Sequence, residues 1–339
     1  MRLAQRRTAL PAALIALSLT VAACGGSDDS SGSDQPHGVA KSKAAEPQTW
    51  PLTGLVAKGS AGEDHPPLVV KMDNTEASSP QQGLGSADMV VEELVEGGIT
   101  RLAAFYYSQI PGVVGPVRSM RASDIGIVSP IHGTIVTSGG AGVTINRIKG
   151  AGIPFVTEGS AGFRRDDTRS APYNLFADLG AVAKATEDGK DSRPEDYLPW
   201  GSESDFKGGK PATSLTADFG GSHSTEWSYQ GGHYVNTNSF APADDQFSAD
   251  SVLVLRVDIG DAGYLDPAGN HVPETKFVGD GDALLFHDGK LEEGTWHKDE
   301  LTSPVTLSTS GGSMKVPAGH TFIELVPIDS KGGSITYAR

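Results

Sequence analysis

Residues 133–149 read GTIVTSGGAGVTINRIK, and this stretch indicates the fold class of the first half of the chain. The apolar run 133–138 suits a strand, and it leads directly into a glycine-rich loop at 139–142. In 143–149, which follows, apolar residues recur at a spacing closer to that of a helix. A strand, a glycine loop and a helix in succession predict a mixed α/β domain.

Other segments of the first half support the same fold class. Residues 68–72, 89–91 and 101–108 are apolar and suit strands. Residues 174–187 are the clearest helix candidate, because four of their apolar side chains fall on one helical face. We therefore expect an α/β (mixed α+β) N-terminal domain at 51–190.

The second half reads as short strands between turns. Residues 251–258 predict a buried strand, and 320–326 predict a final one. Residues 283–296 predict a β-hairpin, because Asp288-Gly289 suits a tight turn between two strands. A polar segment broken by proline and glycine is expected as a linker at 191–212, and a β-rich domain at 213–339.

The first 50 residues predict export and lipid attachment. Arg2, Arg6 and Arg7 form a positive region near the start, residues 8–23 carry no charge, and Val-Ala-Ala precedes Cys24, the single cysteine of 339 residues. This pattern is typical of a lipoprotein signal peptide at 1–23, with Cys24 as the lipidated residue, although a buried or free thiol is the alternative. Residues 24–50 are polar and small, as in a flexible tether. We expect an extracytoplasmic protein held to the cell membrane by lipid, exported by the Sec or the twin-arginine route.

Composition excludes several classes of protein. The formal net charge is −15, which argues against non-specific binding of nucleic acid. A single cysteine excludes a disulfide scaffold and a cysteine-rich metal site.

The arginines are unevenly distributed along this acidic chain. Between 101 and 169, seven arginines and one lysine stand against four acids. Arginine suits bidentate contacts with phosphate or carboxylate, so an anion-binding cleft is one interpretation. The other is that these arginines form structural ion pairs with the acids of 50–100. Nearby carboxylates could hold Mg²⁺, with Asp73, Asp88 and Asp124 as candidate ligands, although no cofactor is certain.

Several motifs resemble those of the YerB-like lipoproteins, a bacterial family of unknown function with an N-terminal and a C-terminal domain. The stretches that carry the resemblance are MDN at 72–74, PQQGLGSAD at 80–88, EGGITR at 96–101, GPVRSMR at 115–121, the Gly139-Gly140 pair, RSAPYN at 169–174 and GTWHK at 294–298. The resemblance implies a cell-envelope lipoprotein, and its most specific stretches fall on the arginine-rich segment. A fainter analogy links the same segment to the LytR-CpsA-Psr phosphotransferases.

These observations leave three hypotheses open. The first is a non-enzymatic lipoprotein that binds an anionic envelope ligand or partner, such as a phosphate-bearing wall precursor. Its candidate ligand-binding residues are Arg101, Arg118, Arg121, Asn174, Gly139 and Gly140. The second is an Mg²⁺-dependent phosphotransferase or pyrophosphate hydrolase acting on polyprenyl-linked precursors. The third is a non-catalytic scaffold for cell-wall proteins. Whether the protein is an enzyme stays open, with the balance against it.

Overall fold

The longest apolar strands form the centre of one large sheet. In the computed structural model, which describes residues 47–187 and 193–339, three strands of seven residues each are buried along their whole length. They are β1 (Leu68–Asn74), β3 (Thr100–Tyr106) and β20 (Thr321–Pro327). A strand covered on both faces is mostly apolar, and these segments are, apart from a few buried charged residues such as Lys71, Arg101 and Glu324.

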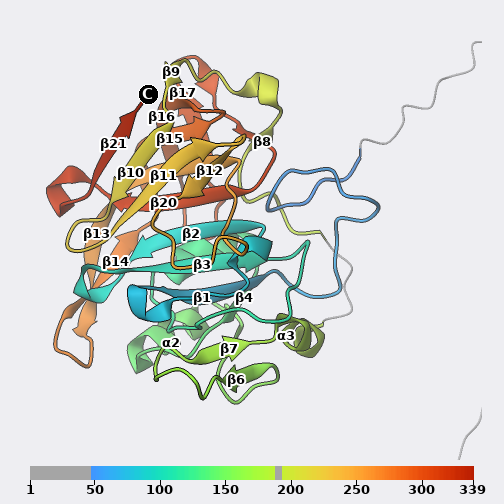
Figure 1. Ribbon diagram of the computed structural model, residues 1–339, viewed down its shortest axis with the longest axis vertical. Helices are drawn as coiled ribbons and strands as arrows, with labels where there is room; N and C mark the ends of the chain where they lie inside the picture. The colour runs from blue at the N-terminus through green and yellow to red at the C-terminus, as the bar shows by residue number, and fades with distance from the viewer. Residues whose placement is uncertain (1–46, 188–192) are drawn as a thin grey trace, which may run out of the picture. The chain divides into compact units, whose positions relative to one another are not determined.

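The central sheet has thirteen strands and runs through both halves of the chain (Figure 1). From one edge to the other the strands are β18 (Gly312–Ser313), β17 (Thr306–Thr309), β16 (Lys290–Lys298), β15 (Gly279–His287), β13 (Ser251–Leu265), β20, β2 (Met89–Leu94), β3, β1, β4 (Thr134–Val136) and β5 (Phe155–Val156). Two further strands lie off this path: β14 (His271–Lys276) pairs with β13, and β9 (Lys210–Pro211) pairs with β16.

Strand β20 joins the two halves. It pairs in parallel with β2 on one side and with β13 on the other, and Ile323 lies opposite both Val91 and Leu253. The N-terminal half and the β-rich C-terminal half therefore share one set of backbone hydrogen bonds, and both contribute to the hydrophobic cluster on each face of the sheet.

The central sheet is covered on both faces. One face packs on α3 (Leu179–Thr186) and on a second sheet, whose strands in order are β12 (His233–Asn236), β11 (Ser224–Gln230), β10 (Ser214–Asp218) and β21 (Ser334–Ala338). The other face packs on α1 (Asp124–Val128) and α2 (Gly142–Gly150). Two small pairs complete the fold: β6 (Phe163–Arg165) with β7 (Leu175–Ala177), and β8 (Trp200–Gly201) with β19 (Val316–Pro317).

The local predictions for the glycine loop and the hairpin are confirmed. The loop at 139–142 connects β4 to α2. Residues Asp288 and Gly289 both have positive φ, at 48° and 66°, as a tight hairpin turn between β15 and β16 requires.

The helix predicted at 174–187 begins later than expected. Residues 175–177 form β7, and α3 starts at Leu179 after Asp178, whose side chain accepts a hydrogen bond from the Ala181 amide at 3.1 Å. The apolar side chains of 175–176 are buried because they belong to a strand, which a helical pattern alone does not reveal.

The segment expected as a linker at 191–212 contributes to the fold over its described part. Tyr197 and Leu198 are buried in the core, and both β8 and β9 lie in this stretch. The predicted signal peptide, Cys24 and most of the predicted tether lie outside the described residues.

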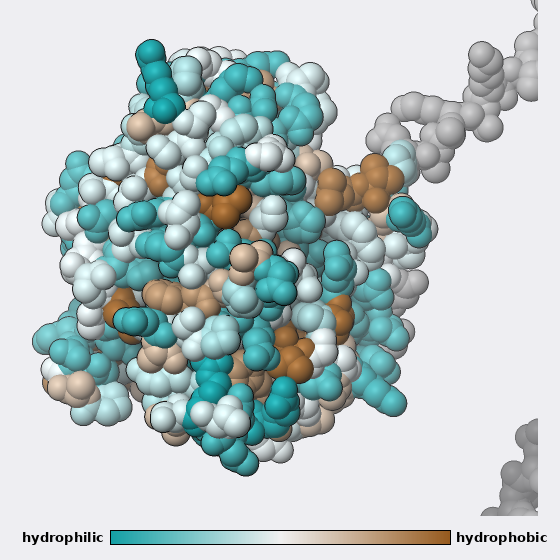
Figure 2. Space-filling model, viewed as in Figure 1, coloured by the Kyte–Doolittle hydropathy of each residue, from teal (hydrophilic) through white to brown (hydrophobic). Residues whose placement is uncertain are grey.

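The face of the molecule in Figure 2 is mostly hydrophilic. Apolar side chains appear there as small separate patches, which is normal for a protein surface. Among the described residues, no helix is long and apolar enough to cross a bilayer.

Because β20 joins both halves, we expect the folded body to unfold in one transition. Replacing Ile323, which is 1% exposed, by alanine should cost about 2–5 kcal/mol and lower the midpoint without splitting the transition. Urea unfolding followed by tryptophan fluorescence and by far-UV circular dichroism checks this. Val56→Ala, at a residue 62% exposed, is the control and should change little. Two separate transitions, of which only one moves in Ile323→Ala, would contradict the shared core.

Candidate functional site

Charged side chains line one buried face of β1, β2 and β3. Arg101 on β3 lies opposite Asp73 on β1 and Glu93 on β2. Lys71, two residues before Asp73, belongs to the same face because strand side chains alternate. All four side chains are nearly or fully buried. Buried charges are costly unless they are paired, so each of these needs a partner.

Lys71 is held between two acids. Its Nζ lies 2.7 Å from Glu93 Oε1 and 2.7 Å from Asp124 Oδ1, and none of the three side chains is exposed. Burial alone would lower the pKa of Lys71, but the adjacent Asp124 and Glu93 carboxylates raise it above its ordinary value. Asp124 is the first residue of α1, so this ion triad attaches the helix to the sheet.

Arg101 and Arg121 share one carboxylate. Arg121 contacts both carboxylate oxygens of Glu96, with Nε 2.8 Å from Oε2, and Arg101 Nη2 lies 3.2 Å from Oε1. Arg101 also donates to the Ser119 carbonyl at 2.7 Å. Burial and the neighbouring Arg121 charge lower the pKa of Arg101 to about 10. Both guanidinium groups are thus neutralised in part by an acid of the upstream segment.

Arg118 is the most accessible of the three candidate arginines. Its Nε lies 2.8 Å from Asp73 Oδ2, its guanidinium lies 5.2 Å from the centre of the Tyr173 ring, and its side chain is 18% exposed. Among the described residues, its two terminal nitrogens have no hydrogen-bond partner. They are the guanidinium nitrogens most available to a ligand.

A cavity of about 530 Å³ lies beside this cluster. It is lined by Ser119, Arg121, Ser138, Gly140, Ala141, Tyr264, Leu265, Asp266, Pro267 and Val272. Its far wall is the end of the β13–β14 hairpin, which is attached to α2 by a 2.8 Å hydrogen bond between Tyr264 and Thr144 and by the Arg147–Glu274 ion pair. The cavity therefore lies between the glycine loop and a strand pair from the C-terminal half.

Several donors converge at the glycine-loop end of this cavity. The hydroxyls of Ser119 and Ser138 lie 3.2 Å apart. The amides of Gly140 and Ala141 have no acceptor among the described residues, and α2 begins at Gly142 without a side-chain cap. An uncapped helix start and free amides favour a negative group. One acid, Asp266, also lines the cavity.

The other predicted ligand-binding residues have structural contacts. Gly139, at φ +116°, donates its amide to Thr137 Oγ1 and accepts from the Met120 amide, so it shapes the loop. Asn174 is buried and accepts from Arg165 at 2.6 Å. Gly139 and Asn174 do not line the cavity, whereas Gly140 does.

The three aspartates proposed as metal ligands are not brought together. Asp73 pairs with Arg118, Asp124 pairs with Lys71, and Asp88 accepts from the amides of Tyr107 at 2.6 Å and Ser108 at 2.9 Å. Within the residues that the structure describes, no group of three or more metal-ligating side chains is close enough to hold an ion. Asp73 lies on β1, Asp88 precedes β2 and Asp124 begins α1, and each already has partners.

Sequence reasoning missed part of this site. Ser119 and Ser138 were not singled out, and the Tyr264–Val272 hairpin end was not expected near the glycine loop. Lys71 offered a signal, because a lysine inside the apolar run LVVKM must be paired if the strand is buried.

Two family models match the chain. The N-terminal domain of the protein of unknown function DUF3048 matches residues 52–192, and its C-terminal domain matches residues 215–323. A curated relative, named "Putative lipoprotein YerB" of Bacillus subtilis (strain 168), is 27% identical over 289 residues, which cover 82% of this chain and 86% of the relative. The crystal structure of the Bacillus subtilis YerB protein superposes with a TM-score of 0.70 at 23% identity, covering 85% of this chain and 99% of that one.

Removing the cation of the buried triad should destabilise the fold strongly. Lys71→Met leaves Glu93 and Asp124 buried without a counter-charge, and we expect a loss of about 3–5 kcal/mol at pH 7. The loss should shrink as the pH falls, because burial and the Asp124 charge raise the pKa of Glu93, so that this carboxyl takes up a proton once Lys71 is absent. Urea unfolding at pH 5 and 7 measures both effects, with the exposed Lys58→Met as control. A loss under about 1 kcal/mol at pH 7 would show that the triad contributes little.

Proposed function

The chain belongs to the DUF3048 family, whose N-terminal and C-terminal domains it carries in order, and on that premise we propose that it is a lipid-anchored envelope protein that binds an anionic group. Two facts support the anchor. Cys24 follows a leader of the lipoprotein type, and a relative covering most of the chain is named a lipoprotein. The anchor would hold the folded body outside the cytoplasmic membrane, joined to it by residues 24–50.

The cavity at the start of α2 supports the binding role. Two serine hydroxyls and two free loop amides converge there, beside the Arg121–Glu96 ion pair, and this convergence is the observation that carries the proposal. Such donors suit a phosphate or a carboxylate. The ligand would be an anionic envelope component, for example a phosphate-bearing wall precursor.

A scaffold for cell-wall proteins is the second candidate, and the ion pairs favour it. Glu96 pairs with both Arg101 and Arg121, and Asp73 pairs with Arg118. The arginine surplus of the sequence is therefore largely consumed inside the fold. A metal-dependent transferase would need neighbouring carboxylates, and Asp73, Asp88 and Asp124 have separate partners.

The anchor predicts fatty-acid labelling at one residue. When cells expressing the full chain are fed an alkyne fatty acid, the wild-type protein should carry label and Cys24→Ser should carry none. Ser27→Ala, a change just downstream, should keep the label. Since the chain has a single cysteine, label retained by Cys24→Ser would exclude thiol attachment.

The binding role predicts an anion-dependent rise in thermal stability. Inorganic pyrophosphate at 100 times its dissociation constant should stabilise the full chain by about 2.7 kcal/mol, and titrations with and without Mg²⁺ show whether the ion contributes. Ser138→Asp places a negative charge in the cavity wall and should abolish the shift. Ser160→Asp adds the same charge at an exposed serine outside the cavity and should preserve it. No shift with any anion would favour the scaffold.

A further inference from the structure

Two glutamates face each other inside the sheet at the junction of the two halves. Glu92 on β2 and Glu324 on β20 are register partners in the parallel ladder, and neither is exposed at all. Their side chains point toward the second sheet, away from the arginine cluster. Two adjacent carboxylates without solvent cannot both be ionised, so at least one of them holds a proton.

Glu92 is the ionised member of the pair, because it is surrounded by donors. Its Oε1 receives hydrogen bonds from Thr100 at 2.5 Å and from Asn74 at 2.9 Å, and its Oε2 receives one from Thr225 at 2.8 Å. His223 Nε2 lies 2.9 Å from Oε1. A carboxylate accepts such bonds at both oxygens, and they stabilise its charge.

Glu324 is the protonated member. Trp227 donates to its Oε1 at 2.8 Å, while its buried Oε2 has no donor among the described residues. A proton on Oε2, donated to the neighbouring Glu92, satisfies both groups. Burial and the charge of Glu92 raise the pKa of Glu324 well above its ordinary value.

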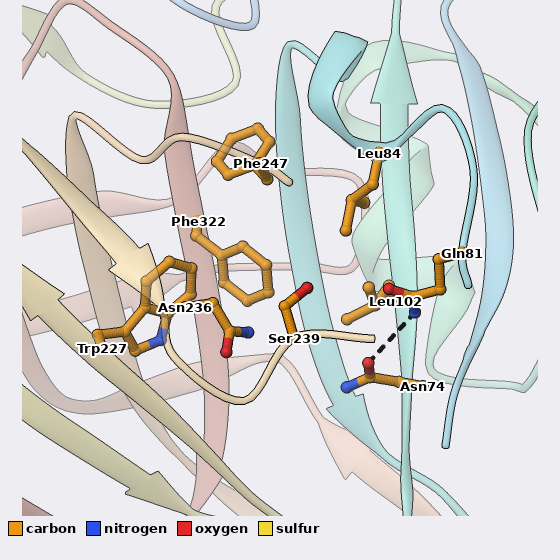
Figure 3. A pocket seen from close by; sticks show the side chains of 9 residues that line it. All are labelled: Asn74, Gln81, Leu84, Leu102, Trp227, Asn236, Ser239, Phe247 and Phe322. Carbon is orange, nitrogen blue, oxygen red and sulfur yellow. Dashed lines mark hydrogen bonds between the residues drawn. The ribbon is translucent and has the colours of Figure 1, made fainter. Parts of the chain in front are cut away.

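Bulk water does not reach the pair. Trp227 and Asn74 line a cavity of about 10 Å³, which is room for one water molecule at most. Figure 3 shows Trp227 and Phe322 on one side of this cavity and Asn74 and Gln81 on the other, with Gln81 hydrogen-bonded to Asn74. The residues beside the carboxyl pair are thus closely packed, and Asn74 and Trp227 already donate hydrogen bonds to Glu92 and Glu324.

His223 is the member of the network nearest to solvent. Its side chain is 13% exposed, and it lies in the turn between β10 and β11. Burial alone would lower its pKa, but the hydrogen bond and charge of Glu92 raise it above the ordinary value. The charged groups that face it are Glu92 from β2 and Asp218 from β10, and the group that faces Glu324 is Glu92.

We propose that Glu92, Glu324 and His223 form a proton-dependent latch that fastens the β10–β11 layer to the central sheet. The latch is strongest when Glu324 and His223 are both protonated, because the single negative charge of Glu92 then has a hydrogen-bond donor and a cation. As these protons leave, a second buried carboxylate appears and the cation disappears, so the layer is held less firmly.

The folded protein should lose stability as the pH rises, because it holds protons that the unfolded chain releases. An unfolded glutamate loses its proton near pH 4.5, and an unfolded histidine near 6.5, whereas the folded groups keep theirs to higher pH. The folded state therefore binds more protons above these values. For each extra proton that the folded state binds, the unfolding equilibrium constant increases by about tenfold per unit rise in pH. The increase stops once the folded group also loses its proton.

Glu324→Gln tests the shared proton directly. The amide can still accept from Trp227 and donate to Glu92, but it does not titrate. We expect the ratio of wild-type to variant unfolding constants, from urea titrations of the full chain, to rise by about tenfold per pH unit above pH 5. A ratio that is constant from pH 5 to 8 would overturn the proposal. Glu92→Gln, which removes the needed charge, should destabilise at every pH.

A second variant and a local measurement distinguish a proton-dependent contact from a general loss of stability. His223→Gln should remove the part of the pH dependence above pH 6.5, while His297→Gln, at an exposed histidine, should not. Hydrogen exchange of the β10–β11 amides should be faster in wild type than in Glu324→Gln at pH 8, and equal at pH 5. Equal exchange at both values would contradict a latch at this layer.

Discussion

Strand β20 comes from the end of the chain and lies between β13 and β2, so its two parallel ladders connect everything else. The sheet on both sides depends on this insertion, because strands from the first half would otherwise end at an unpaired edge. The insertion also places the strands around the junction between two covering layers. Side chains on both faces of these strands are therefore removed from water.

Burial on both faces explains how the charges are arranged. On one face, basic side chains of β1 and β3 lie against acids, as Lys71 does between Glu93 and Asp124. On the other face, His223 is the one base near Glu92 and Glu324 within the described part of the chain, so a proton takes the place of a second cation. The same constraint, a buried charge without solvent, is met by ion pairing in one place and by protonation in the other.

These pairings limit what the arginine-rich segment can do. Arg101 and Arg121 hold Glu96, and they have little capacity left for a free ligand. What remains is the terminal guanidinium of Arg118 and the donors of the glycine-loop cavity. The hairpin from the C-terminal half forms the opposite wall of that cavity, so a ligand there would contact both halves of the chain.

The sequence by itself determined the apolar strands near 68–72, 89–91, 101–108, 251–258 and 320–326, the glycine loop before α2, the β15–β16 hairpin and the family, because these follow from local patterns of a few residues. The sequence also showed the surplus of arginine in residues 101–169, although it left open whether ligands or acids of the same chain pair with these arginines. Only the tertiary structure placed Glu96 between two arginines, separated Asp73, Asp88 and Asp124, and set Glu92 beside Glu324. Those contacts join residues up to 232 positions apart in one strand register, and strand pairing at such separations leaves no mark in the local sequence.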